Sequence, residues 1–272
     1  MTITIKDDFD LQKIADSGQC FRWQKLGQDH YRIIYKDQCL LIRHCDWQEY
    51  DLSCNETEFQ KIWAAYFDLD LNYEQICSRI DKNTDPFLSA AAEHEQGIRI
   101  LRQDPWETLI SFIISQNRNI PAIKRSIELL CTLAGEEMFD PDGGCFYSFP
   151  DPQAILNLTE KELQSCKLGY RGKYILAAAN AVSKGEIKLS ETDTLSNEEL
   201  LSRLTSIYGV GVKVASCVML FGFHRLDAFP VDVWVKKILK NEYPDGYPME
   251  RYSPYNGIYQ QYMFAYYRNT IG

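Results

Sequence analysis

A lysine after a glycine turn and an aspartate after a proline are well placed to do chemistry. Lys213 follows Gly209-Val210-Gly211, and Asp232 closes the segment Pro230-Val231-Asp232. A neutral lysine amine is a nucleophile, and a carboxylate can pair with a cation or move a proton. Beside a helix start, whose free N–H groups bind phosphate, this pair suits attack on a sugar carbon of a nucleic acid.

A helix-hairpin-helix must position these residues, and residues 204–223 predict one. An amphipathic helix ends near Tyr208, two glycines form a hairpin through backbone angles that other residues avoid, and an apolar helix runs to Phe223. The positive end of its dipole should favour the neutral form of Lys213. A third helix is expected at Asp232, because proline and aspartate favour helix starts.

The rest of the chain predicts an α+β fold. Two short alternating runs and one short apolar run in the first 50 residues predict an antiparallel sheet with hairpins. They are Thr2–Ile5, Tyr31–Tyr35 and Cys39–Ile42. Helical periodicity begins near Thr57, and an all-helical region is expected from residue 97. We therefore expect an antiparallel sheet domain with helices in residues 1–96 and a helical domain in residues 97–272.

Composition is that of a globular protein. Of the 272 residues, 45% are hydrophobic and 25% charged. No run of about 18 apolar residues predicts a membrane span, and the first residues do not resemble a secretory signal. Nine scattered cysteines without a CxxC pair fit a reducing cytoplasm, and speak against a zinc or iron–sulfur site. We expect a cytoplasmic location, associated with the nucleoid if the source is a bacterium.

The net charge of -9 counts against non-specific DNA binding, but the placement of the charges along the chain matters more. Between Lys213 and Lys240, five basic residues and two acids give a local balance of 5 − 2 = +3. Acids concentrate in the N-terminal half. We therefore expect a polarised surface with one basic face.

The segment from Gly209 to Asp232 resembles the helix-hairpin-helix, Gly-Pro-Asp superfamily of DNA glycosylases. A lysine at position 213 marks its bifunctional branch, which cuts the glycosidic bond and then nicks the strand. Residues 17–23, SGQCFRW, resemble a signature of the 8-oxoguanine DNA glycosylases. The resemblance implies that the Gly18 carbonyl accepts a hydrogen bond from N7–H, which 8-oxoguanine has and guanine lacks. Facing an unprotonated N7 instead would cost about 1–3 kcal/mol.

The same resemblance implies the rest of the site. Cys217 packs against the extruded base, and Gln260 and Phe264 contact its edge and plane. Asn117 fills the space that the extruded nucleotide leaves and contacts the base opposite the lesion. Tyr170 is the wedge that stacks into the duplex beside that space, and Arg171 contacts the opposite base. Ala122 stands where mammalian-type members carry an arginine that reads cytosine, which predicts relaxed choice of the opposite base. DNA contacts at the hairpin are implied for Gly209, Gly211 and Trp234, although many relatives have a histidine in place of the tryptophan.

The family's mechanism implies that Lys213 attacks C1′ and forms a Schiff base while Asp232 stabilises the developing charge. β-Elimination then breaks the strand. The implied fold is a monomer with an N-terminal sheet resembling that of the TATA-box-binding protein. No cofactor is implied, apart from a possible monovalent cation held by the carbonyls of Thr205, Ile207 and Val210.

Two alternatives stay open at this point. One is a glycosylase of the same superfamily acting on another damaged purine, such as an alkylated or mismatched one. Gly18, Gln260 and Phe264 argue against it, because they form a set that reads a purine with N7–H. The other is a non-catalytic helix-hairpin-helix module that binds DNA, which would have no need for Lys213 and Asp232 together.

Overall fold

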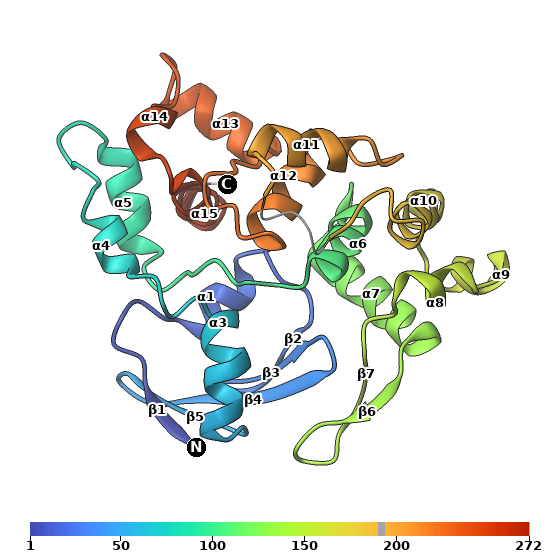
Figure 1. The fold of residues 1–272 in the computed structure, drawn as a ribbon. Coiled ribbons are helices and arrows are strands. Elements are labelled where there is room, and N and C mark those ends of the chain that lie inside the picture. The colour runs from blue at the N-terminus through green and yellow to red at the C-terminus, as the bar shows by residue number, and fades with distance from the viewer. Residues whose placement is uncertain (190–193, 272) are drawn as a thin grey trace.

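The computed structural model describes residues 1–189 and 194–271, which form a five-stranded sheet beside a larger array of helices (Figure 1). The strand order is β1-β5-β4-β3-β2, and all neighbours are antiparallel. The strands are β1 (Thr2–Thr4), β2 (Trp23–Gly27), β3 (His30–Tyr35), β4 (Gln38–Asp46) and β5 (Glu49–Leu52). The antiparallel sheet predicted from alternation is therefore confirmed.

Three of the four helical segments beside this sheet share one apolar core with it; the exception is Glu56–Glu58, which buries no side chain. Trp63, Ile33 and Leu40 in this core are fully buried, and each such side chain contributes about 1.5–3 kcal/mol. The segments are α1 (Leu11–Asp16), α2 (Glu56–Glu58), the π-helical η1 (Phe59–Trp63) and α3 (Ala64–Tyr66). The last three follow one another directly, where helical periodicity begins in the sequence.

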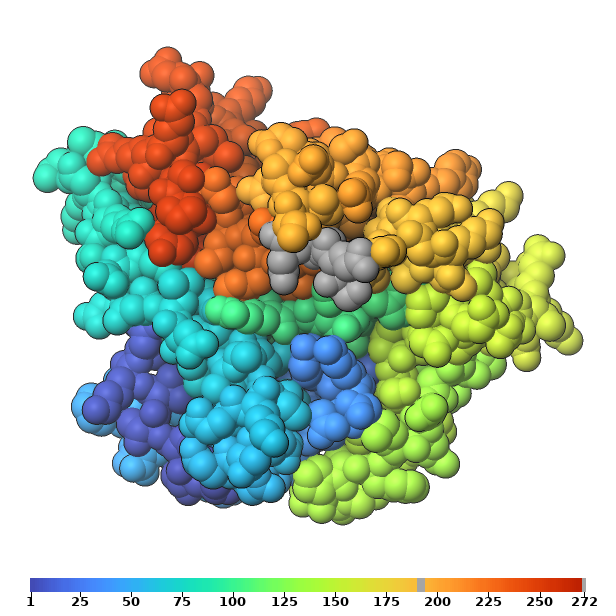
Figure 2. All heavy atoms as spheres, viewed as in Figure 1, coloured from blue at the N-terminus to red at the C-terminus, as the bar shows by residue number. Residues whose placement is uncertain are grey.

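A second apolar core lies among the helices from α4 onward. They are α4 (Tyr73–Cys77), α5 (Pro86–His94), α6 (Pro105–Ser115), α7 (Ile120–Ala134), α8 (Pro152–Leu156), α9 (Glu160–Ser165), α10 (Arg171–Ser183), α11 (Asn197–Thr205), α12 (Val212–Phe221), α13 (Val233–Glu242), α14 (Met249–Tyr252), α15 (Asn256–Tyr266) and η2 (Tyr267–Ile271). Helix α5 packs against α15, and Figure 2 shows the cyan segment against the red C-terminal one. The chain passes from the first core to the second between Phe67 and Tyr73, although Leu101 belongs to the first core and Phe21 to the second. The domain boundary at residue 96 stays a prediction.

The helical part contains a β-hairpin that the sequence did not predict. Strands β6 (Glu137–Phe139) and β7 (Cys145–Tyr147) pair antiparallel. Asp140 stabilises their connection by accepting the Gly144 N–H at 2.7 Å, and Arg32 from the main sheet donates to Asp140 at 3.0 Å. The expectation of an all-helical region from residue 97 is therefore wrong here, because strands of three residues are too short to show alternation.

Aspartate side chains cap the N-termini of helices around the site. Asp104 accepts hydrogen bonds from the N–H groups of Trp106 and Glu107 at the start of α6, and Pro105 is the first residue of that helix. Such caps satisfy N–H groups that the helix itself leaves without partners.

Among the described residues, no helix combines the length and apolar character needed to cross a bilayer.

Candidate active site

The hairpin between α11 and α12 turns at Gly209, where only glycine fits. Gly209 has φ +89°, and a Cβ there would lie 2.1 Å from the Tyr174 ring. Its carbonyl accepts a hydrogen bond from Gln116 Nε2 at 3.1 Å, which ties the turn to the end of α6. These contacts determine where α12 begins, and with it the position of Lys213.

Gly211 does not need the backbone freedom that we predicted for both glycines. It is the N-cap of α12 with φ −90° and ψ 173°, an extended conformation open to any residue. A Cβ there would meet no atom of the described residues within 4 Å. The expectation was wrong for Gly211, and its missing side chain instead leaves the N-terminus of α12 open to an anion.

Six residues selected from the sequence line one cavity of about 50 Å³. They are Gly18, Lys213, Cys217, Asp232, Gln260 and Phe264. They come from the loop after α1, from α12, from the start of α13 and from α15, so four distant segments meet here.

Lys213 and Asp232 face this cavity from different helix starts. Lys213 is half-buried, and its Nζ lies 5.3 Å from the centroid of the Phe112 ring. Asp232 is the N-cap of α13, and its Oδ1 accepts the N–H groups of Trp234 and Val235 at 2.9 and 2.8 Å. Neither residue belongs to any ion pair among the described residues. The carboxylate is thus fixed by the backbone, and the amine is not bound to it.

Cys217 lies one turn after Lys213 and is 3% exposed. Burial raises the pKa of its thiol to about 11, although the nearby Lys213 lowers it in part. The thiol therefore stays protonated near pH 7 and is a poor nucleophile. This state fits a packing role.

The loop that carries Gly18 is held by Gln19, a residue whose role sequence reasoning missed. Gly18 has φ +82°, a conformation that glycine adopts without strain. The Gln19 side chain is 0% exposed; it donates to the Arg99 carbonyl at 2.8 Å and accepts the Leu101 N–H at 2.8 Å. Gln103 donates to the Gln19 carbonyl at 2.8 Å. The backbone beside Gly18 is therefore rigidly placed, as a carbonyl that reads a ligand requires.

Asn117 and Tyr170 meet on the surface at the end of α6. Asn117 is exposed, has φ +52°, and donates through Nδ2 to the Tyr170 hydroxyl at 3.3 Å. Tyr170 is 49% exposed. An exposed aromatic beside an amide can enter a base stack and replace a lost base. The structure therefore brings these two predicted residues together, while their roles stay predictions.

Arg171 is buried, and its guanidinium holds backbone carbonyls. It donates through Nε to the Gln116 carbonyl at 2.8 Å and through Nη1 to the Leu168 carbonyl at 3.3 Å. Its guanidinium also lies 4.4 Å from the centroid of the Tyr170 ring. In this state Arg171 fixes the Asn117 turn, and a contact with the opposite base would require these bonds to break.

Ala122 lies in the first turn of α7, where its N–H donates to the capping Asn119 side chain at 3.0 Å. Its methyl group offers no hydrogen bond to a base.

Sequence reasoning passed over Arg118, four residues before Ala122, which donates to Ser126 Oγ at 2.6 Å and to the Lys167 carbonyl. Arg118 is thus already engaged with the protein.

Trp234 stands in the first turn of α13 with a cation on its ring. Lys237 Nζ lies 4.4 Å from the ring centroid. The i,i+3 spacing of the two residues could have indicated this contact. Lys237 therefore supplies a positive charge next to Trp234.

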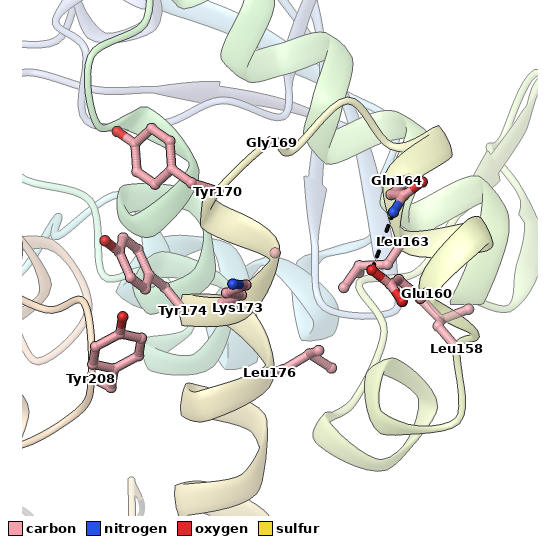
Figure 3. Close-up of a pocket in the computed structure, with 11 residues that line it drawn as sticks. Leu158, Glu160, Leu163, Gln164, Gly169, Tyr170, Lys173, Tyr174, Leu176 and Tyr208 are labelled. Atoms are coloured by element: carbon pink, nitrogen blue, oxygen red, sulfur yellow. Dashed lines mark hydrogen bonds between the residues drawn. The ribbon is translucent and has the colours of Figure 1, made fainter.

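A larger hollow, of about 690 Å³, lies beside the hairpin. Figure 3 shows Tyr170, Tyr174 and Tyr208 in a row along one side of it. Neighbouring ring centroids in this row are 5.6 and 5.1 Å apart in edge-to-face contact. Lys213 and Asp232 do not line this hollow. It offers aromatic surface next to the hairpin, whereas the residues able to do chemistry lie in the smaller cavity.

The monovalent cation expected at the hairpin stays a prediction. Its three ligands would be carbonyl oxygens, which suit a hard cation. The Ile207 carbonyl accepts the Val210 N–H at 3.0 Å, so it keeps one lone pair for such an ion. The Thr205 hydroxyl donates back to the Leu201 carbonyl at 2.8 Å and is directed along α11. These residues fit the ion chemically.

Fold and cavity together define a helix-hairpin-helix protein with a lysine and an aspartate at one pocket. The family model described as 8-oxoguanine DNA glycosylase, N-terminal domain, matches residues 2–109. The model described as HhH-GPD superfamily base excision DNA repair protein matches residues 110–245. The chain belongs to the 8-oxoguanine DNA glycosylase family within this superfamily.

Individual relatives agree with this assignment. The N-glycosylase/DNA lyase of Saccharomyces cerevisiae is 32% identical over 262 residues, which covers 88% of this chain and 69% of that protein. The Arabidopsis thaliana N-glycosylase/DNA lyase is 31% identical over 234 residues, covering 83% and 64%. The Clostridium acetobutylicum 8-oxoguanine glycosylase/lyase, in complex with duplex DNA that has cytosine opposite 8-oxoguanine, superposes with a TM-score of 0.89 at 35% identity, covering 99% and 98%.

Proposed function

We propose that this chain excises 8-oxoguanine from duplex DNA and then cleaves the strand at the resulting site. The observation that carries the proposal is the meeting of Lys213, Asp232 and Gly18 around one cavity. The relatives with matching names and the DNA complex of the Clostridium enzyme support the same activity. A binding module would have no use for a nucleophile and a fixed carboxylate at one cavity.

Recognition of the base would begin with extrusion from the duplex, since the reacting bond is out of reach inside the stack. The carbonyl of Gly18, next to the fixed Gln19, accepts N7–H, while Phe264 and Cys217 contact the two faces of the base. Guanine, which lacks N7–H, would leave the carbonyl and N7 as two opposed acceptors. This repulsion disfavours binding of every undamaged guanine that enters the cavity.

The chemistry assigned to Lys213 has two stages. Its amine attacks C1′, the bond from C1′ to N9 breaks, and the base leaves with the electron pair and takes up a proton. Opening of the sugar ring gives an imine, and loss of a C2′ proton then expels the 3′ phosphate by β-elimination. Asp232, fixed at the start of α13, stabilises positive charge that develops on the sugar.

The surface around the cavity would hold the duplex. The open start of α12 binds a phosphate, Tyr170 enters the stack, and Asn117 fills the space left by the extruded nucleotide. Because Ala122 cannot donate to cytosine, we propose relaxed choice of the opposite base. A monomer is sufficient, because all of these groups come from one chain.

An excision assay on duplexes with a single 8-oxoguanine tests the proposal. Strand breakage without added alkali measures combined glycosylase and lyase action, and alkali treatment reveals abasic sites left uncut. We expect breakage with 8-oxoguanine and none with guanine at the same position. Duplexes with 3-methyladenine test the alternative purine, and binding without release of any base would instead indicate a non-catalytic module.

A further inference from the structure

A second glutamine lines the base cavity, and the proposed mechanism does not use it. Gln261 follows Gln260 on α15; the two are 4% and 3% exposed, and both line the cavity with Lys213. Burial of a glutamine amide is unfavourable unless its polar atoms find partners. The partners of these two side chains therefore indicate what each can still offer to a ligand.

A chain of hydrogen bonds fixes the orientation of both amides. Gln260 Nε2 donates to the Pro230 carbonyl at 3.1 Å, and Gln261 Nε2 donates to Gln260 Oε1 at 3.1 Å. A carbonyl has no proton to give, so the Gln260 atom against Pro230 must be its NH₂ group. The Gln260 oxygen then faces Gln261, so the Gln261 atom that donates to it must be the NH₂ group. The remaining atom, Gln261 Oε1, is oriented by this chain.

Gln261 Oε1 is buried, and none of the described residues donates a hydrogen bond to it. Two other polar side chains at the cavity are already engaged: Ser17 Oγ donates to the Ile14 carbonyl at 2.7 Å, and Asp232 Oδ1 caps α13. A buried acceptor without a donor is costly, and a ligand that supplies an N–H removes the cost. The structure thus leaves an acceptor without a partner at the place where the base binds.

We propose that Gln261 is a specificity-determining residue whose Oε1 accepts an N–H from the 2-amino group of the extruded base. This inference rests on the proposed excision of 8-oxoguanine. A guanine-type edge presents N1–H and the 2-amino group side by side. Gln260 Oε1 keeps one lone pair for the first, and Gln261 Oε1 takes the second. A base without the 2-amino group leaves Gln261 Oε1 buried and unpaired.

The test compares 8-oxoguanine with 8-oxohypoxanthine, which keeps N7–H and N1–H and lacks only the 2-amino group. Both are placed opposite cytosine, and excision is measured under single-turnover conditions with the full chain. Wild type should excise 8-oxoguanine at least about tenfold faster than 8-oxohypoxanthine, because a site built to bond an N–H rejects an analogue without it. Gln261→Leu should slow excision of 8-oxoguanine and bring the two rates within about twofold.

A control variant makes the outcome decisive. Gln75→Leu, which replaces an exposed glutamine on α4, should behave as wild type. If Gln261→Leu slows both substrates equally, the residue is merely structural and the proposal is overturned. An unchanged ratio overturns it as well. No excision of 8-oxoguanine by wild type would overturn both this inference and the proposed function.

Discussion

Lys213 and Asp232 lie at the starts of two different helices, line the same cavity, and form no ion pair with each other. The Asp232 Oδ1 atom is committed to two backbone N–H groups of α13. An ion pair would keep the lysine protonated and turned toward the carboxylate. The separation leaves the amine available for a sugar carbon, while the carboxylate stays fixed.

Asp232→Asn should separate the catalytic role of the carboxylate from its structural one. Asparagine also caps helices well, so the melting temperature should change little. Loss of the negative charge should slow excision by about 10²-fold or more, the usual effect of removing electrostatic stabilisation. Single-turnover rates and thermal melting measure the two effects. Asp151→Asn, which alters the exposed cap of α8, is the matched control. Equal rates for wild type and Asp232→Asn would contradict the role.

Gly18→Ala should impair recognition of the base without impairing strand cleavage. A Cβ at Gly18 meets nothing closer than 3.8 Å, but φ +82° strains an alanine by about 1–2 kcal/mol and shifts the carbonyl. Excision of 8-oxoguanine should fall at least about tenfold, since a misplaced recognition group costs about that much or more. Cleavage of a ready-made abasic site, which has no base to read, should be unchanged.

Gly143→Ala is the matched control for that variant, because Gly143 has φ +84° on the β6–β7 turn and open space around it. Parallel losses in excision and in cleavage of abasic sites by Gly18→Ala would show that the substitution acts on the fold and not on base recognition.

Ala122→Arg should introduce a preference for the opposite base. An arginine in the first turn of α7 gains donors that bond cytosine acceptors, and such a contact is worth about 1–3 kcal/mol of discrimination. Wild type should excise 8-oxoguanine at similar rates opposite all four bases, and the variant should favour cytosine by about tenfold. Ala122→Leu adds bulk without donors and should show no preference. A strong cytosine preference in wild type would contradict our reading of Ala122.

Asp68 should make stability depend on pH in the acid range. Its carboxylate lies 3.1 Å from His224 Nε2 and 2.7 Å from Arg102 Nη2. Burial alone would raise the pKa of Asp68, but hydrogen bonds and charges from His224 and Arg102 outweigh it and lower the pKa. A lowered pKa contributes stability above the unfolded-state value of about 3.9, which is lost as pH falls through the folded-state value.

Asp68→Asn should therefore reduce the free energy of unfolding at pH 7 by about 1.5–3 kcal/mol, the usual effect of losing hydrogen bonds to a charged group. Its stability should also fall less steeply than that of wild type below about pH 4. Urea unfolding between pH 7 and pH 3 measures both, with the exposed Asp70→Asn as control. A variant whose acid profile runs parallel to that of wild type would contradict the assignment.

The sequence predicted features that depend on neighbouring residues, and missed those that depend on distant ones. The cap at Asp232 and the glycine turn at Gly209 follow from local chemistry. The hydrogen bonds of Gln19 and Gln261 depend on residues far along the chain or on which amide atom faces which carbonyl. No pattern in the sequence reports such contacts.

Arg171 shows the same limit for a single side chain. In the sequence Arg171 only stands next to Tyr170, and the structure makes it the first residue of α10. Its burial and its bonds to the Gln116 carbonyl arise because α6 ends next to the start of α10, a packing contact between segments about 55 positions apart.

Borohydride trapping on duplex DNA with 8-oxoguanine tests the central claim most directly, because borohydride reduces an imine between enzyme and sugar to a stable amine. Wild type should form a covalent complex with the lesion duplex and not with the guanine duplex. Lys213→Gln should form none while still binding the lesion. A covalent complex with Lys213→Gln, or none with wild type that binds the lesion, would contradict the assignment of Lys213 as the nucleophile.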